Sequence, residues 1–125
     1  MKIKARILSF KYAFQGLKDL FSTQENSKIH AVMAVLSLGM GFYFGISQIE
    51  WCLIIFAISS VLAAEAFNTG LEHLTDLVSP DHHELAGRTK DVAAAGVLLT
   101  ALGAALVGIV IFLPKCYELL VFLLS

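Results

Sequence analysis

Two long uncharged segments, residues 31–49 and 92–114, set the strongest limit on how this chain of 125 residues can fold. A helix needs about 20 predominantly apolar residues to cross the hydrocarbon core of a bilayer, and both segments meet that requirement. A third apolar run, residues 51–64, reaches the same length only if its helix continues past Glu65. Hydrophobic residues make up 58% of the chain, whereas soluble proteins contain roughly 45–50%. The sequence therefore predicts an all-α membrane protein. We expect transmembrane helices over residues 30–49, 51–75 and 92–113.

The first 22 residues carry a different pattern, in which apolar side chains recur at steps of three and four and basic side chains fill the positions between them. The apolar positions are Ile3, Ile7, Phe10, Phe14, Leu17 and Phe21. This periodicity predicts an amphipathic helix over residues 2–22 that lies in the membrane interface, and its simplest role is that of an anchor. Together with the three spans it would form a single domain over residues 1–125.

The distribution of Lys and Arg predicts the orientation in the membrane. Six basic residues precede the first predicted span, and Arg88 and Lys90 lie between the second and third. The turn between the first and second spans has Glu50 and no basic residue. By the positive-inside rule, the N-terminus and the 76–91 loop are expected in the cytoplasm.

An acidic and amide face begins inside the second apolar run. Glu65, Asn68, Glu72 and Asp76 are separated by three, four and four residues, so they share one side of a helix. An ionised carboxylate within a membrane is costly and usually serves a cation or a proton path. Glu72, nearer the cytoplasm, suits Mg²⁺, which binds carboxylates together with substrate phosphates. Glu65 is deeper and suits a general base for a hydroxyl that enters from the lipid, with Asn68 placed to orient it.

Other interpretations of these residues remain open. Glu72 and Asp76 could be ordinary interfacial charges, and Asn68 could join two helices by a hydrogen bond. Lys90 and Asp91 could simply begin the third span. At the level of function, the chain could be a proton or ion pathway subunit built on Glu65, or a purely structural membrane subunit.

Local signals predict where helices end and where they pack. Ser79 is expected to cap a short cytoplasmic helix with Pro80 in its first turn, and Pro114 is expected to end the third span. Small residues four apart predict close approach of helices. They are Ser37, Gly41 and Gly45 in the first span, and Gly96, Thr100, Ala104 and Gly108 in the third.

The segment from 65 to 99 resembles the signature of the prokaryotic integral-membrane diacylglycerol kinase family, which includes undecaprenol kinases. The matching pattern is E-x-x-N-[ST]-x-x-E-x-x-x-D, followed by H-E-L-[AS] and K-D. The segments SFKYAFQGL and KIHAVMAV are similar too, so the resemblance runs through most of the chain. It implies a homotrimer in the bacterial inner membrane. It also implies transfer of the γ-phosphate of MgATP to a lipid hydroxyl, on either diacylglycerol or undecaprenol.

The resemblance also implies roles for individual residues. Glu65 matches the general base, Asn68 an active-site amide, and Glu72 a magnesium ligand. Those that match nucleotide contacts are Tyr12, Asp81, His82, His83, Lys90 and Asp91, with Arg6 taken as the equivalent of an arginine that aligns with Ala5.

A second magnesium carboxylate of the family aligns with Gln24, and we expect the neighbouring Glu25 to replace it. The choice of acceptor stays open, although Ile29 and His30 are more similar to the undecaprenol kinase branch.

Overall fold

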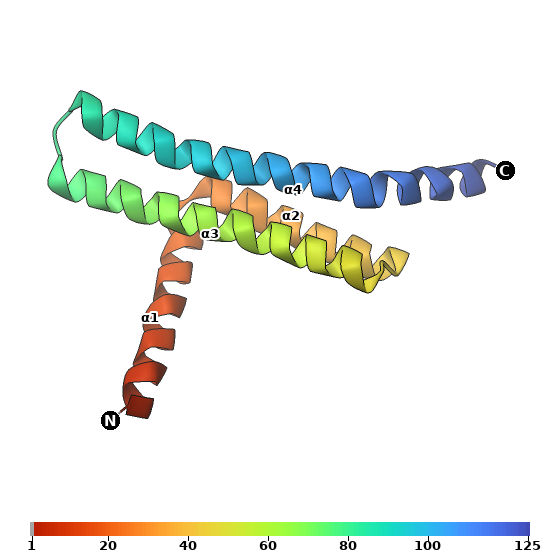
Figure 1. The fold of residues 1–125 in the computed structure, drawn as a ribbon, viewed down its shortest axis with the longest axis horizontal. Helices are drawn as coiled ribbons and strands as arrows, with labels where there is room; N and C mark the ends of the chain where they lie inside the picture. The colour runs from red at the N-terminus through yellow and green to blue at the C-terminus, as the bar shows by residue number, and fades with distance from the viewer. Residues whose placement is uncertain (1) are drawn as a thin grey trace.

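The computed structural model describes residues 2–125, and all of its regular structure is helical. The helices are α1 (Lys2–Thr23), α2 (Glu25–Phe44), α3 (Gln48–Val78) and α4 (Glu84–Leu124). The last three lie alongside one another, while α1 leaves this bundle at a steep angle (Figure 1). Helices α2, α3 and α4 are each long and apolar enough to cross a membrane. The prediction of an all-α chain with three candidate spans is therefore confirmed.

The turn between α2 and α3 is fixed by local chemistry. Gly45 adopts the left-handed conformation with φ of 60° and donates its N–H to the carbonyls of Gly41 and Phe42, a conformation that side chains with a Cβ disfavour. Two residues later, the Ser47 hydroxyl accepts from the Glu50 N–H and the Glu50 carboxylate accepts from the Ser47 N–H, which forms a capping box. α2 therefore ends at Phe44, and both of its ends lie five residues earlier than those of the predicted first span, 30–49.

The connection between α3 and α4 differs from the predicted one. Ser79 ends α3, donating its N–H to the Thr75 carbonyl, instead of capping a new helix. The separate short helix is absent from residues 2–125, because α4 starts at Glu84 and continues without a break. Pro80 disfavours a helical conformation at the preceding residue, and the cap of α4 is His83, whose Nδ1 accepts from the Leu85 N–H at 3.1 Å.

Pro114 does not interrupt α4, and the end of the third span within this helix stays a prediction. α4 passes through it and reaches Leu124. Transmembrane helices tolerate proline because neighbouring groups support the interrupted turn. Here Lys115 follows, and its Nζ donates to the Ile111 carbonyl at 3.3 Å and to Glu50 at 2.7 Å. This ion pair joins α4 to the start of α3.

The lengths of the helices determine the depth of the acidic face. α3 has 31 residues, and about 20 suffice to cross the hydrocarbon core. A span that begins at Gln48 would end near Glu65 and Asn68, so we expect Glu72 and Asp76 in the turns beyond the hydrocarbon core. We therefore expect the acidic face to pass from the edge of the lipid into the interface.

The buried apolar core is small and lies at the end of the bundle that holds the α2–α3 turn. It consists of Ile46, Ile54, Ile111 and Phe112, with Trp51 packed against it. Most other large apolar side chains are exposed in the single chain, as expected where lipid or another subunit covers them. In α1 only Leu20 is buried, and the interfacial position of this helix stays a prediction.

The two stripes of small residues have different surroundings. A Cβ added at Gly41 would lie 2.8 Å from Cη2 of Trp51, so this glycine does permit a close approach. Gly96 and Gly108 have no such neighbour within the chain. Both line grooves instead, so neither glycine makes a close contact within the single chain, and the close approach predicted for the α4 stripe stays a prediction.

The contact at Gly41 yields a stability prediction. We expect Gly41→Ala to lower the melting temperature in detergent, because overpacking costs about 1–3 kcal/mol. Trp51→Phe in the same chain should recover part of the loss by shortening the opposing ring. Gly39→Ala is the matched control, since a Cβ there meets nothing within 4 Å. Equal melting temperatures for the Gly41 and Gly39 variants would contradict the close contact.

Candidate functional site

Glu65 is a buried carboxylate on α3, with 2% of its surface exposed. Two side chains of α2 contact it, one at each oxygen. The Ser27 hydroxyl donates to Oε2 at 3.1 Å, and Nδ1 of His30 lies 2.7 Å from Oε1. When Nδ1 carries its proton, the ring donates to the carboxylate. These contacts take the place of the hydrogen bonds to water that an ionised carboxylate loses when it is buried.

Glu72 lies two turns along α3 and has amide neighbours. Nδ2 of Asn68 donates to Oε1 at 3.3 Å, and Nε2 of Gln24 donates to Oε2 at 3.4 Å. Asn68 thus contacts Glu72, whereas the sequence suggested that it would orient Glu65. Its own Oδ1 is buried without a hydrogen-bond partner. This orphaned oxygen beside a carboxylate is a free acceptor in the site.

A single face of α2 supplies the contacts to both carboxylates. Residues 24, 27 and 30 are three apart, so their side chains point to the same side of the helix start. Because α2 and α3 run antiparallel, Gln24, the first of the three in the chain, contacts Glu72 toward the end of α3. Ser27 and His30 contact Glu65, which precedes Glu72 in α3. The turn at Gly45 sets this register.

The donor set around Glu72 fits a hard divalent cation. Mg²⁺ binds oxygen and is commonly held by one or two carboxylates together with waters and substrate phosphates. Glu72 offers a carboxylate, and Asn68 offers the unpartnered amide oxygen. Within residues 2–125, His, Cys, Asp and Glu side chains do not form a group of three or more suited to a metal. The arrangement is thus suited to an ion that phosphates help to hold, and not to a closed protein cage.

Glu25, the predicted second ligand, lies elsewhere. Its side chain is 82% exposed and pairs with Lys28 at 2.6 Å. The neighbouring Gln24 is the residue that reaches Glu72. The geometry therefore agrees better with Gln24, which aligns with the family's second magnesium carboxylate, than with Glu25, which was expected to replace it.

The candidate nucleotide contacts are distributed over three elements. On α4, Lys90 pairs with Asp76 of α3 at 2.5 Å, and Asp91 is exposed beside it. In the loop, Asp81 and His82 are exposed. His83 is exposed too and its Nδ1 caps α4. The structure thus brings Lys90 to the acidic face.

Arg6 and Tyr12 are not brought to this cluster. Both are exposed on α1, which points away from the bundle (Figure 1). Within a single chain, Arg6 and Tyr12 are therefore not brought together with Lys90, and their predicted contacts with the nucleotide stay a prediction.

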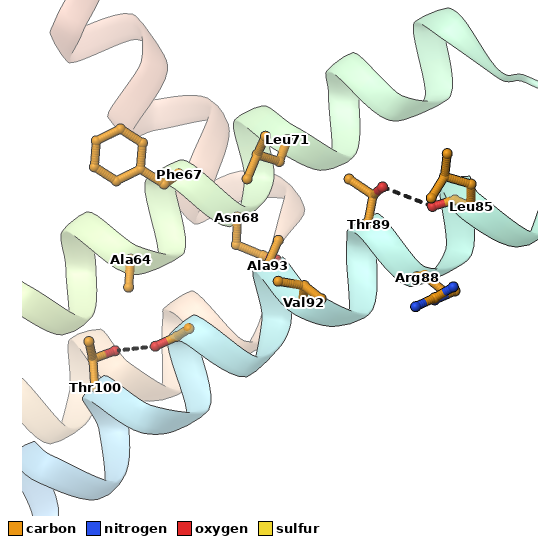
Figure 2. Close-up of a pocket in the computed structure, with 11 residues that line it drawn as sticks. Ala64, Phe67, Asn68, Leu71, Leu85, Arg88, Thr89, Val92, Ala93 and Thr100 are labelled. Atoms are coloured by element: carbon orange, nitrogen blue, oxygen red, sulfur yellow. Dashed lines mark hydrogen bonds between the residues drawn. The ribbon is translucent and has the colours of Figure 1, made fainter.

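Two grooves border the acidic face. One, of about 710 Å³, lies between α3 and α4 and has Asn68 among apolar side chains, with Arg88 toward the loop end (Figure 2). The other, of about 610 Å³, is formed by α2, α3 and α4 and is lined mainly by apolar residues such as Met33, Ile58 and Val61. His30 also lines this second groove. The groove therefore borders a side chain that contacts Glu65.

Ser27 and the contact role of His30 were not predicted from the sequence. The available signal was the polar spacing of residues 24, 27 and 30 at the start of an apolar helix. That spacing indicates a polar face, but it does not say which carboxylate the face meets.

Comparison with known proteins adds to this geometry. The family described as prokaryotic diacylglycerol kinase matches residues 11–112. Undecaprenol kinase of Bacillus subtilis is 38% identical over 107 residues, which cover 86% of this chain and 87% of that protein. Diacylglycerol kinase of Synechocystis is 35% identical over 116 residues, covering 92% of this chain and 66% of that protein. Diacylglycerol kinase of Haemophilus influenzae is 34% identical over 93 residues, covering 74% of this chain and 79% of that protein.

These relatives are named as kinases and give no support to an ion pathway subunit. The chain therefore belongs to the prokaryotic diacylglycerol kinase family of lipid kinases.

Proposed function

We propose that this chain transfers the γ-phosphate of ATP to the hydroxyl of a membrane lipid alcohol, with Glu65 as the general base. The observation that carries the proposal is the position of Glu65. Its carboxylate is buried between α3 and α2, and its contact His30 lines an apolar groove. A lipid can lie along such a groove with its hydroxyl at the polar end.

The chemistry follows from this placement. Glu65 takes the proton of the lipid hydroxyl while the hydroxyl oxygen attacks the γ-phosphorus, and the bond between that phosphorus and the leaving ADP oxygen breaks. Phosphoryl transfer depends mainly on positioning and on neutralisation of charge. Lys90 supplies positive charge near the acidic face, and its pairing with Asp76 holds it there.

Glu72, together with the oxygen of Asn68, would hold Mg²⁺. When bound, that ion would neutralise charge on the phosphates. Gln24 aligns with the second carboxylate of the family, and its Nε2 donates to Glu72 in the structure; a half-turn of the amide group would turn its oxygen toward a bound ion. An amide oxygen carries no net charge, so Gln24 should hold the ion more weakly than a carboxylate would.

We also propose that the active form is a homotrimer in the bacterial inner membrane, with the N-terminus and the α3–α4 loop in the cytoplasm. The Lys and Arg distribution supports this orientation. Exposed apolar side chains on the spans support assembly. So does the direction of α1, the helix of Arg6 and Tyr12, which leaves the bundle at a steep angle (Figure 1). In an assembly, α1 of one subunit can complete the site of its neighbour.

Between the two acceptors, we favour undecaprenol. The undecaprenol kinase of B. subtilis is the more identical of the relatives compared above, and the alignment covers most of both chains. Diacylglycerol is the alternative, since the other two relatives are named for it.

The acceptor and the base are tested together. Purified protein in mixed micelles with labelled ATP and Mg²⁺ should phosphorylate undecaprenol faster than diacylglycerol. Glu65→Gln keeps the size of the side chain but removes the proton acceptor, so turnover should fall by about 10²-fold or more. Near-normal turnover in a folded Glu65→Gln protein would remove Glu65 from the mechanism. Failure to phosphorylate either lipid would contradict the proposed function.

The metal site is tested by a titration with Mg²⁺. Gln24→Glu adds an anionic oxygen near Glu72 and should shift the activity curve to lower Mg²⁺, whereas Glu72→Gln should shift it to higher Mg²⁺. The Mg²⁺-dependent rise in melting temperature should change in the same directions. Glu25→Gln is the matched control, because Glu25 faces Lys28. A larger shift for Glu25→Gln than for Gln24→Glu would restore Glu25 as the ligand.

The shared site is tested by mixing subunits. Glu65→Gln and Arg6→Ala chains should each be impaired alone. Coexpressed, they should recover part of the activity, because some sites then combine an intact Glu65 with a neighbour's intact Arg6. If both residues act within one chain, every site keeps one defect and activity will not recover.

A further inference from the structure

Both oxygens of Glu65 are held by donors from one short stretch of α2. Ser27 contacts Oε2 and His30 contacts Oε1, at 3.1 and 2.7 Å. We infer that Ser27 and His30 are positioning residues, which fix the orientation of the Glu65 carboxylate for proton transfer. This inference rests on the proposed function of Glu65 as the base.

The geometry of these two contacts fixes the orientation of the Glu65 carboxylate. The two donors are three residues apart, so they project from adjacent turns of the same helix. Ser27 has no exposed surface, and His30 is partly buried. Two contacts from one rigid element prevent rotation of the carboxylate about its last bond, whereas a single contact would allow it.

The contacts with Ser27 and His30 leave the Glu65 carboxylate able to accept a proton. An ionised carboxylate has about four lone-pair sites, and Ser27 and His30 use one on each oxygen. The remaining sites can accept a proton from a substrate hydroxyl. His30 also lines the apolar groove, so the same side chain connects the groove to the base.

A purely structural alternative exists, in which the two contacts only attach α2 to α3. It predicts a loss of stability with no specific effect on the chemical step. A positioning role predicts a lower kcat with an unchanged KM for ATP, since nucleotide binding does not involve Glu65. The two alternatives therefore differ in a measurable way.

The test uses the full-length protein in mixed micelles and compares variants of His30. His30→Asn places an amide N–H near the position of Nδ1 and should keep most of the activity. His30→Leu removes the donor and should lower kcat by about 10- to 100-fold, because small misplacement of a catalytic group has effects of that size. Ser27→Ala should act in the same direction. Asn26→Ala, exposed on the same helix, is the control.

A spectroscopic measurement gives an independent readout. The infrared band of the Glu65 carboxyl group is identified by subtracting the spectrum of Glu65→Gln. We expect this band to shift in His30→Leu and in Ser27→Ala, and to return toward its original position in His30→Asn. An unshifted band, or a lowered activity without rescue by His30→Asn, would overturn the positioning role.

Failure of the proposed function would look different. Full activity of Glu65→Gln would show that Glu65 is not the base, whatever the variants of α2 do. The infrared band would then still report whether Ser27 and His30 contact the carboxylate.

Discussion

The cost of burying one carboxylate governs the organisation of this bundle. An ionised group can leave water only where other groups replace its hydrogen bonds. At Glu65 the replacements come from α2, so the first turns of α2 must lie against the middle of α3. The same face continues to Glu72 through Gln24. The relative position of these two helices is thus determined as much by polar contacts as by apolar packing.

The turn between α2 and α3 makes that register possible. Gly45 and the Ser47–Glu50 capping box fix where one helix stops and the other starts. A residue inserted into α2 just before this turn would rotate the start of α2 relative to α3 by about 100° and separate Ser27 from Glu65. The glycine and the cap therefore influence the site from the opposite end of both helices.

The sequence predicted the spans and the acidic face because both follow from periodicity and length. Glu65 and Glu72 share a face whatever the helix packs against. The partners of these residues were harder to predict, since they depend on the register set by the turn at 45–47. Glu25 is an example, because its charge made it the more attractive ligand although its neighbour faces α3. The capping role predicted for Ser79 was wrong for a related reason, because its local preference says nothing of where the preceding helix ends.

The bundle is held unevenly along its length. The apolar core, the contact of Trp51 with Gly41, and the Glu50–Lys115 pair all gather at the end with the α2–α3 turn. The opposite end carries the hydrogen bonds among polar side chains, and the groove between α3 and α4 borders it. The cluster of buried apolar residues does not extend to that end, so local opening should cost less free energy there than at the α2–α3 turn.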